Sequence, residues 1–339
     1  DRLIGYRTSR FARSWSLSSM GRVQTPTLGF VVKREKEIQK FIPTPYWAVQ
    51  AFAVGIEFKL RFHNSKDSSA WRDNKGKFNS HRTNETELAE KSFEHLKNIG
   101  ELKISEIKLK TYNRKPKPPF TTDTMLQATG SKYNWRPSNT MRIAQALYEA
   151  GHITYMRTDS TRTSASSRQK AKEKITSKWG NQYIGKGVLG GKQKSNVQDA
   201  HEAIRPTDPF VELPNNLDSS QVRLYRLIWS RFIASQMSDS EWTSMRIQAN
   251  LDVFDEALFL RFGLTKADGE TKWRVSPGWE SAFEAIDKAP STSSPSADIS
   301  EGKLIKLDDI KENPRLIEDQ TKPPNRYTQH GLVALMKSE

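Results

Sequence analysis

The stretch NRKPKPPFTT, residues 113–122, separates two kinds of sequence and so decides how the chain is divided. Three of its ten residues are prolines, and three are arginine or lysine. Proline has no backbone N–H to donate and cannot continue a helix or a central strand. The stretch therefore predicts a linker between the region before it and the region after it.

The region before the linker has the pattern of β-strands. Apolar and polar residues alternate, with many aromatic and β-branched side chains, over residues 46–54, 56–64 and 101–112. A short helix is expected from about residue 84 to residue 99, where Gly100 stops it.

The region after the linker is helical at first and then returns to strands. Helices are expected over residues 124–133, 138–150, 164–179 and 219–237, and strands over residues 244–254 and 257–265. Gly151 and Gly180 stop the second and third helices. Because β-rich sequence lies on both sides of the helices, we expect an α+β multidomain protein in which a helical insert interrupts one sheet domain.

Length and composition limit the classes of protein. A chain of 339 residues exceeds what one hydrophobic core usually serves. No apolar run approaches the roughly 20 residues that cross a bilayer, and nothing resembles a signal peptide. The absence of cysteine excludes disulfides, thiol catalysis and cysteine-ligated zinc. We expect a cytoplasmic protein that does not associate with membranes.

The charge is large and unevenly placed. The formal net charge is +15, and residues 101–200 hold 19 Lys or Arg against 7 Asp or Glu. Residues 201–339 hold 17 basic against 22 acidic side chains. A basic middle segment indicates a polyanionic partner, with nucleic acid the first candidate, and a solvated basic surface is the alternative.

The segment HITYMRT, residues 152–158, contains a candidate nucleophile. Strand alternation places Ile153, Tyr155 and Arg157 on one face. A free phenol has a pKa near 10, so a nucleophilic tyrosine needs a cation or a base beside it. Arg157 has the spacing to stabilise both a phenolate and a phosphorane, while Asp159 and Ser160 could hold the arginine or contact a sugar-phosphate chain. A half-buried strand tyrosine beside a surface arginine is the alternative.

The segment DAHEAIRPTD, residues 199–208, predicts a short helix that Asp199 caps and Pro206 ends. His201 and Arg205 are four residues apart and would share a helix face. This pair suits a phosphate clamp better than a metal site, because arginine does not ligate metals. A surface helix with incidental charges is the alternative.

The segment SMGRVQTPT, residues 19–27, leads into an expected helix. Arg22 and Gln24 precede a helix N-terminus that Thr25 and Pro26 open. Backbone N–H groups at such an end attract anions.

Taken together, these segments resemble those of a type IA DNA topoisomerase, and the bacterial topoisomerase I branch is the most similar. Nearly the whole chain takes part in the resemblance, through ITYMRTDST, AHEAIRPTD, GRVQTPT, PPFTTDTMLQAT, TMRIAQALYEAG and TKPPNRYTQHGLVALMK.

The resemblance implies the chemistry. Tyr155 would attack single-stranded DNA, leaving a 5'-phosphotyrosyl link and a free 3'-hydroxyl, and another strand would pass through the gap before religation. Arg157 and His201 would act on the scissile phosphate, and the DNA-binding residues would be Ser19, Arg22, Gln24, Asp159, Ser160 and Arg205. Relaxation of negatively supercoiled or underwound DNA would need no ATP.

The resemblance also implies an architecture shaped as a torus around DNA. Residues 1–40 and 296–339 would be two parts of a helical groove domain, and residues 41–115 and 242–295 a β-rich arch. Residues 116–241 would be a helical, winged-helix-like gate that carries Tyr155, with its basic surplus on the inner wall of the torus.

One expected part of the family is missing from the sequence. A Toprim domain would bind Mg²⁺ through a glutamate and clustered aspartates, and no DxDxE-type cluster occurs here. The chain also starts at Asp1 and stops at Glu339, so we expect a fragment that lacks the Toprim domain and a C-terminal part. Such a fragment would need that partner for activity, and the whole protein is expected to be a nucleoid-associated monomer.

Two further interpretations stay open at this point. The chain could be a non-cleaving clamp for single-stranded DNA, held by a basic groove and aromatic stacking. It could also be the topoisomerase half of a reverse gyrase, although the helicase-like GxxxxGK[ST] loop that this requires does not occur in the sequence.

Overall fold

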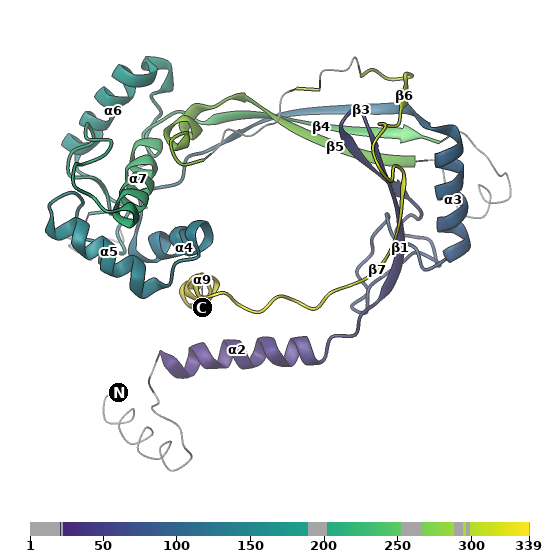
Figure 1. The fold of residues 1–339 in the computed structure, drawn as a ribbon, viewed down its shortest axis with the longest axis horizontal. Helices are drawn as coiled ribbons and strands as arrows, with labels where there is room; N and C mark the ends of the chain where they lie inside the picture. The colour runs from purple at the N-terminus through teal and green to yellow at the C-terminus, as the bar shows by residue number, and fades with distance from the viewer. Residues whose placement is uncertain are drawn as a thin grey trace, which may run out of the picture.

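The computed structural model describes residues 21, 23–188, 202–251, 266–287, 294–295 and 299–338. Its elements follow one another around a ring, with helices on one side and a curled sheet along the top and the other side (Figure 1). Mixed helix and antiparallel strand content confirms the predicted α+β class. No helix among these residues is long and apolar enough to cross a membrane.

The sheet has seven strands in the order β6-β3-β4-β5-β2-β1-β7. Every neighbouring pair is antiparallel. The strands are β1 (Pro45–Ala53), β2 (Ile56–Arg61), β3 (Glu101–Arg114), β4 (Ser240–Asn250), β5 (Lys266–Ser276), β6 (Leu304–Lys306) and β7 (Arg315–Gln320). Because β3 and β4 pair across the whole helical insert, the predicted interruption of one sheet is confirmed.

One face of the sheet is apolar and packs against helix α3 (Thr86–Ile99). Phe58 and Leu60 of β2 are buried there with Leu88 and Leu96 of α3. Gly100 ends the helix in the left-handed region at φ 66°, where a side chain would be strained, so this predicted stop is confirmed.

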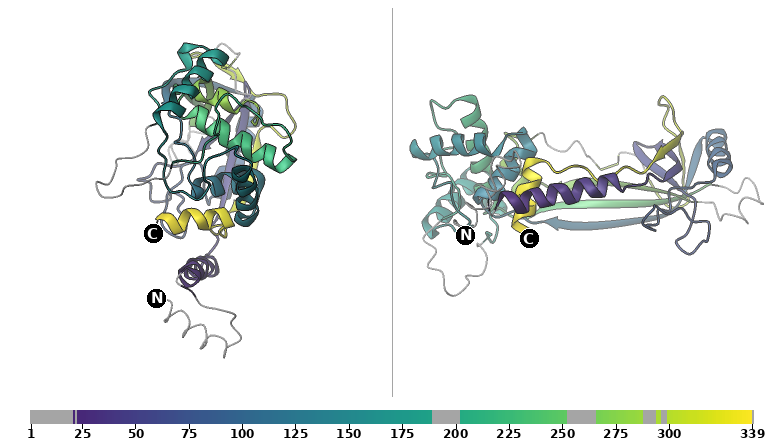
Figure 2. Two further views of the ribbon diagram at one scale, coloured as in Figure 1. Left: turned by 90° about the vertical axis from the view of Figure 1, so that its left-hand side faces the viewer. Right: turned by 90° about the horizontal axis from the view of Figure 1, so that it is seen from below.

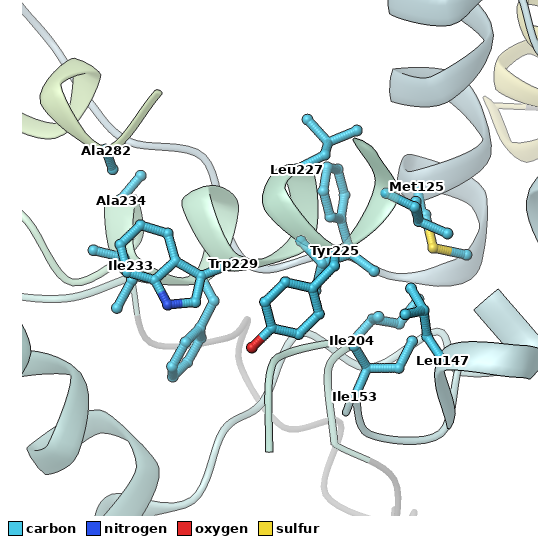
Figure 3. Packing of buried hydrophobic residues seen from close by; sticks show 14 of the residues in the cluster. Met125, Leu147, Ile153, Ile204, Tyr225, Leu227, Trp229, Ile233, Ala234 and Ala282 are labelled. Atoms are coloured by element: carbon cyan, nitrogen blue, oxygen red, sulfur yellow. The ribbon is translucent and has the colours of Figure 1, made fainter. Parts of the chain in front are cut away.

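The helical unit contains α4 (Thr122–Tyr133), α5 (Pro137–Glu149), α6 (Ala165–Trp179) and α7 (Ser219–Ala234), with short 3₁₀ turns η1 (Asn181–Tyr183) and η2 (Gly278–Phe283). Its core gathers around α7 (Figure 3). Met125, Leu147, Ile153 and Ile204 lie beside Tyr225, whose buried hydroxyl donates to the Val211 carbonyl at 2.7 Å. The predicted helices 124–133, 138–150, 164–179 and 219–237 are confirmed, with shifts of up to three residues at their ends.

The C-terminal part of the chain differs from the prediction. Residues 296–339 were assigned to a helical groove domain, but β6 and β7 within this range pair with β3 and β1 and belong to the sheet. The sequence RLIEDQ of β7 is short and strongly charged, so its alternation gives little strand signal. Helix α9 (Gln329–Ser338) then follows. The strand predicted at residues 257–265 lies outside the described residues.

Helix α2 (Gln24–Gln39) and the segment before α9 lie side by side, as two views show (Figures 1 and 2). Arg34 donates to the Tyr327 hydroxyl at 2.8 Å and to the Asn325 carbonyl at 2.9 Å. Arg326 pairs with Glu35 at 2.6 Å. No side chain of α2 is buried, so polar contacts such as these hold it in place.

Candidate active site

The segment that contains Tyr155 is irregular, with bends at Thr154 and Met156, and is not a sheet strand. Ile153 pairs with Pro206 in an isolated antiparallel bridge. Tyr155 is 41% exposed and Arg157 is exposed, whereas Met156 and Thr158 are buried. Tyr155 and Arg157 are therefore both exposed, as the predicted shared face requires, but Ile153 was wrongly placed on that face. Ile153 points into the core because the bend at Thr154 interrupts the strand alternation between residues 153 and 155.

The hydroxyl of Thr122, at the start of α4, anchors this segment from one side. This hydroxyl donates to the Met156 carbonyl at 2.7 Å and to the Thr158 carbonyl at 3.0 Å. It also accepts from the Thr158 N–H at 2.9 Å. The Thr122 N–H also donates to the Thr158 carbonyl at 2.8 Å. These bonds satisfy the backbone on both sides of Arg157 and fix where its side chain leaves the chain.

The hydroxyl of Thr154 anchors the segment from the other side. It donates to the Ala203 carbonyl at 2.7 Å, and its backbone N–H donates to the Arg205 carbonyl at 2.9 Å. The Ile204 N–H in turn donates to the Phe120 carbonyl at 2.8 Å. Three stretches that are distant in sequence, around residues 120, 155 and 204, are thus joined by backbone hydrogen bonds.

The helix predicted over residues 199–206 is wrong in its described part. Residues 202–206 are extended, because their backbone groups bond to the two neighbouring stretches instead of to one another. Arg205 is mostly buried and its guanidinium pairs with Glu202 at 2.5 Å. Asp199 and His201 lie outside the described residues.

A cleft of about 640 Å³ lies beside the tyrosine segment. Its lining comes from the first turns of α4, from the tyrosine segment and from α9, namely Thr122, Asp123, Leu126, Arg157, Thr158, Asp159, Val333 and Met336. Thr121 caps α4 in a capping box with Thr124. The positive end of the α4 dipole and Arg157 therefore both favour an anion at this cleft, while Asp123 and Asp159 oppose it.

Three other residues that were predicted to bind DNA, Asp159, Ser160 and Gln24, differ in accessibility. Asp159 is exposed and lines the cleft. Ser160 is buried, and its hydroxyl accepts from the Arg162 N–H at 3.2 Å, so it shapes the turn after the cleft. Gln24 is the first residue of α2, and one turn later the Thr27 hydroxyl lies 3.0 Å from the Met336 sulfur in the cleft wall. Ser19 and Arg22 lie outside the described residues.

Three other tyrosines of the helical unit, Tyr148, Tyr225 and Tyr133, pack against neighbouring side chains. Tyr148 packs edge-on against Tyr155, with ring centroids 5.3 Å apart. Burial raises the pKa of Tyr225 and, although Arg223 opposes it, also that of Tyr133. Neither buried phenol lines the cleft, whereas Tyr155 and Tyr148 are 41% and 40% exposed, and Tyr155 lies two residues from Arg157 in the cleft lining.

Two residues important for this geometry, Thr122 and Thr154, were missed as site residues by the sequence analysis. Threonine is common in strands and at helix starts, so neither carries a distinctive signal alone. The only available cue was the position of Thr122 inside the resembling segment PPFTTDTMLQAT.

No group of three or more potential metal ligands occurs within the part of the chain that the structure describes. The described residues therefore do not fit a divalent metal, and no chemical step is assigned to one here.

The ring of elements thus carries an exposed tyrosine on one segment with an arginine that lines an anion-favouring cleft. A family model described as DNA topoisomerase matches residues 1–339, and the chain belongs to this family.

Similar proteins of known sequence agree with this assignment. DNA topoisomerase 1 of Thermotoga maritima is 33% identical over 352 residues, which include 99% of this chain and 49% of that protein. DNA topoisomerase 1 of Fervidobacterium islandicum is 31% identical over 362 residues, which include 100% of this chain and 46% of that protein. The chain spans about half the length of these relatives.

A solved structure has the same fold. Full-length topoisomerase I from Thermotoga maritima superimposes with a TM-score of 0.74 at 30% identity, covering 99% of this chain and 51% of that one. The predicted type IA resemblance is confirmed at the level of family and fold.

Proposed function

We propose that this chain is the cleavage and strand-passage part of a type IA DNA topoisomerase, acting on single-stranded or underwound DNA. The observation that carries the proposal is the exposed Tyr155 and Arg157 alternating with buried Met156 and Thr158, with the backbone between them anchored by the Thr122 and Thr154 hydroxyls. Rigid anchoring of this kind holds a nucleophile in the geometry for in-line attack.

The proposed reaction exchanges one phosphodiester for another. The Tyr155 phenol oxygen forms a bond to phosphorus as the bond from phosphorus to the 3'-oxygen breaks. The phenol loses a proton and the departing 3'-oxygen gains one, which leaves a 5'-phosphotyrosyl link and a free 3'-hydroxyl. Religation reverses each step, so no ATP is consumed.

The remaining site residues have proposed roles in holding DNA. Arg157 and the α4 N-terminus would stabilise the charge of the pentavalent phosphate. His201 would contact that phosphate with Asp159 beside it, while Ser160, which is buried, and Arg205, which pairs with Glu202, would support this DNA-binding surface. Ser19, Arg22 and Gln24 would line the groove that guides single-stranded DNA toward the cleft.

The cofactor, partner and location are also proposals. Mg²⁺ would be bound by a Toprim domain that is not part of this sequence, which contains no DxDxE-type cluster. The protein would act as a nucleoid-associated monomer in the cytoplasm.

The test is formation of a covalent adduct. The chain, supplemented with a Toprim domain and Mg²⁺, is incubated with single-stranded DNA labelled at either end, and protein-linked DNA is measured. We expect adduct on the 5' side of the break, lost in Tyr155→Phe and kept in Tyr148→Phe, which removes the neighbouring and similarly exposed hydroxyl. Adduct on the 3' side, or adduct that survives Tyr155→Phe, would contradict the proposal.

A second candidate is a non-cleaving clamp for single-stranded DNA, favoured by the net charge of +15. A clamp would bind DNA in a salt-sensitive manner, would be unaffected by Tyr155→Phe, and would form no adduct under the conditions above.

A further inference from the structure

A pocket of about 400 Å³ lies where the sheet meets the helical unit. We call it the joint pocket. Its lining comes from the end of β3, the linker after it, α7, β4, β5 and η2, and includes Arg114, Lys117, Arg231, Trp242, Trp279 and Phe283. It shares no lining residue with the cleft beside the tyrosine segment. A ligand in the joint pocket would therefore contact both regions of the protein without occupying the proposed active site.

Hydrogen bonds between the two regions hold the walls of the joint pocket in place. The turn η2 packs on α7 in the core of the helical unit (Figure 3). From this turn the Trp279 indole N–H donates to the Arg114 carbonyl of β3 at 2.8 Å. In the other direction, the Trp242 indole N–H of β4 donates to the Glu280 carboxylate of η2 at 2.9 Å. The two indoles are thus fixed before any ligand arrives.

Aromatic rings give the pocket an apolar wall. Trp242, Trp279 and Phe283 all line it. Trp279 packs edge-on against Phe283, with ring centroids 5.9 Å apart. The Arg114 guanidinium lies over the Trp242 ring, 3.9 Å from its centroid. Flat apolar groups pack well against rings of this kind, so the wall favours a ligand with an aromatic body.

The most informative group of the lining is Arg231 of α7, a partly buried cation that lacks a carboxylate partner. Its Nε–H donates to the Pro118 carbonyl at 2.6 Å. Its two terminal nitrogens make no hydrogen bond or ion pair within the part of the chain that the structure describes. Burial lowers the pKa of Arg231 to about 10, so the guanidinium remains charged at neutral pH. An anion would offset this loss of hydration.

Two of the three carboxylates in the lining are already bound to other groups. Glu280 accepts from the Ser240 hydroxyl at 2.8 Å and pairs with Arg274 at 3.2 Å. Asp287 pairs with Lys132 of α4. In all, four Lys or Arg line the pocket against three Asp or Glu. An excess of one positive charge suits a monoanion, whereas the carboxylates would repel a phosphate group of higher charge.

We propose that the joint pocket binds a planar aromatic carboxylate, with its ring against the tryptophan wall and its carboxylate on Arg231. The two terminal nitrogens of a guanidinium can donate to both oxygens of one carboxylate, and such charge-assisted bonds are strong. The inference does not rest on the proposed function, because neither the tyrosine segment nor the cleft beside it takes part.

The test measures binding of 2-naphthoate to the full chain by isothermal titration calorimetry at pH 7.5. We expect one saturable site with a Kd of roughly 0.1 to 1 mM, which is typical of a ligand of this size. The neutral analogue 2-naphthylmethanol keeps the ring and lacks the charge. It should bind at least about tenfold more weakly, because it cannot form the charge-assisted pair.

The variant Arg231→Met tests the carboxylate contact. It replaces an unpaired cation with an apolar side chain of similar length, so the melting temperature should change little. Binding of 2-naphthoate should weaken at least about tenfold, and the preference over 2-naphthylmethanol should disappear. The matched control Arg226→Met removes the same charge from the same helix outside the pocket and should keep the wild-type Kd.

A second variant keeps the test decisive should Arg231→Met fail to fold. Lys117 lines the pocket from the exposed linker, where a substitution does not disturb a core. Lys117→Gln should weaken 2-naphthoate binding by about two- to fivefold, as expected for an exposed charge, and should leave 2-naphthylmethanol binding unchanged.

Spectra of ¹⁵N-labelled protein locate the bound ligand. The indole N–H signals of Trp242 and Trp279, assigned with Trp→Phe variants, should shift with the Kd found by calorimetry. The Trp71 indole, which donates to the Pro45 carbonyl at the start of β1, should not shift. Three results would overturn the proposal: no saturable binding, equal Kd values for Arg231→Met and Arg226→Met, or saturation that leaves both pocket indoles unshifted.

Discussion

The helical unit and the sheet place their buried surface differently. In the helical unit the core lies directly under the tyrosine segment, with Ile153 and Met156 buried in it. In the sheet the core lies at the α3 end, while Leu109 of β3 and Val275 of β5 remain 65% and 53% exposed. The chain is therefore most tightly packed beneath the tyrosine segment, and it buries least along the parts of β3 and β5 that lie away from α3.

The joint between the two regions is polar and specific. Trp279 of η2 donates to the Arg114 carbonyl at 2.8 Å, at the end of β3. Glu280 accepts from Trp242 at 2.9 Å and pairs with Arg274 at 3.2 Å. On the helical side, Arg231 donates to the Pro118 carbonyl, and burial lowers its pKa to about 10. A defined joint of this kind orients the helical unit relative to the sheet.

The largest expected effect tests the chemical side of this comparison. Arg157→Ala should lower the rate of covalent adduct formation by about 10²- to 10³-fold, because it removes a cation beside the developing phosphate charge. Arg157 is exposed, so the melting temperature should change little. The control, Arg142→Ala on exposed α5, removes the same charge from the same unit. Equal rates of adduct formation by the two variants would show that Arg157 does not act in the site.

The next effect tests whether rigidity of the tyrosine segment matters. Thr122→Val deprives the Thr158 N–H and the Met156 carbonyl of their partner. We expect a loss of roughly 2 kcal/mol in unfolding free energy. Calorimetry should show it as a fall of about 4 to 8 °C in melting temperature.

Adduct formation by the same variant should fall at least about tenfold, because misplacement of a catalytic group is costly. Thr122→Ser keeps the hydroxyl and should recover most of both losses. A Thr122→Val protein with wild-type adduct formation would show that the anchor is not needed for chemistry.

A smaller effect tests the contact that closes the ring between α4 and α9. A Cβ atom added at Gly130 would lie 2.5 Å from the His330 Cβ. Gly130→Ala should therefore push α9 away, at a cost of about 1 to 3 kcal/mol. Hydrogen exchange of α9 backbone amides should become faster, while that of α7 stays unchanged.

The double variant Gly130→Ala with His330→Gly lacks the clash. Its α9 amides should therefore exchange at the same rate as those of His330→Gly alone. Unchanged exchange in Gly130→Ala would mean that α9 packs on α4 less closely than the structure indicates.

The smallest effect concerns the sheet region alone. Burial lowers the pKa of His63 against the opposing charges of Glu85 and Asp67, so the unfolded chain binds this proton more readily. The stability that His63 contributes is complete above its unfolded pKa near 6.5 and is lost as the pH falls below it. Between pH 7.5 and 5.5, the melting temperature of the wild type should fall further than that of His63→Asn. Parallel pH profiles of the two proteins would contradict this.

The sequence predicted best the features that depend on local pattern. The stop at Gly100, the helices after the linker and the interruption of the sheet all follow from periodicity and turn residues. The shared exposure of Tyr155 and Arg157 follows from the same rule.

The features it missed depend on distant partners. Residues 202–206 are extended because they bond to the stretches around residues 120 and 155, which no local pattern records. The Thr122 anchor and the strand β7 likewise form only when segments far apart in sequence meet. The remaining predicted domain boundaries and the roles of the individual site residues stay predictions.

The strand order of the sheet has a consequence for how the protein is made. Its two edges, β6 and β7, both come from the last part of the chain, at Leu304–Lys306 and Arg315–Gln320. Strands β1 and β3 leave the ribosome early, but β1 keeps an exposed edge until β7 is synthesised and β3 keeps one until β6 is synthesised. The helical unit, apart from η2, is continuous from α4 to α7 and needs no such late partner. We therefore expect the helical unit to fold during translation before the sheet, which can close only after β7 has been synthesised.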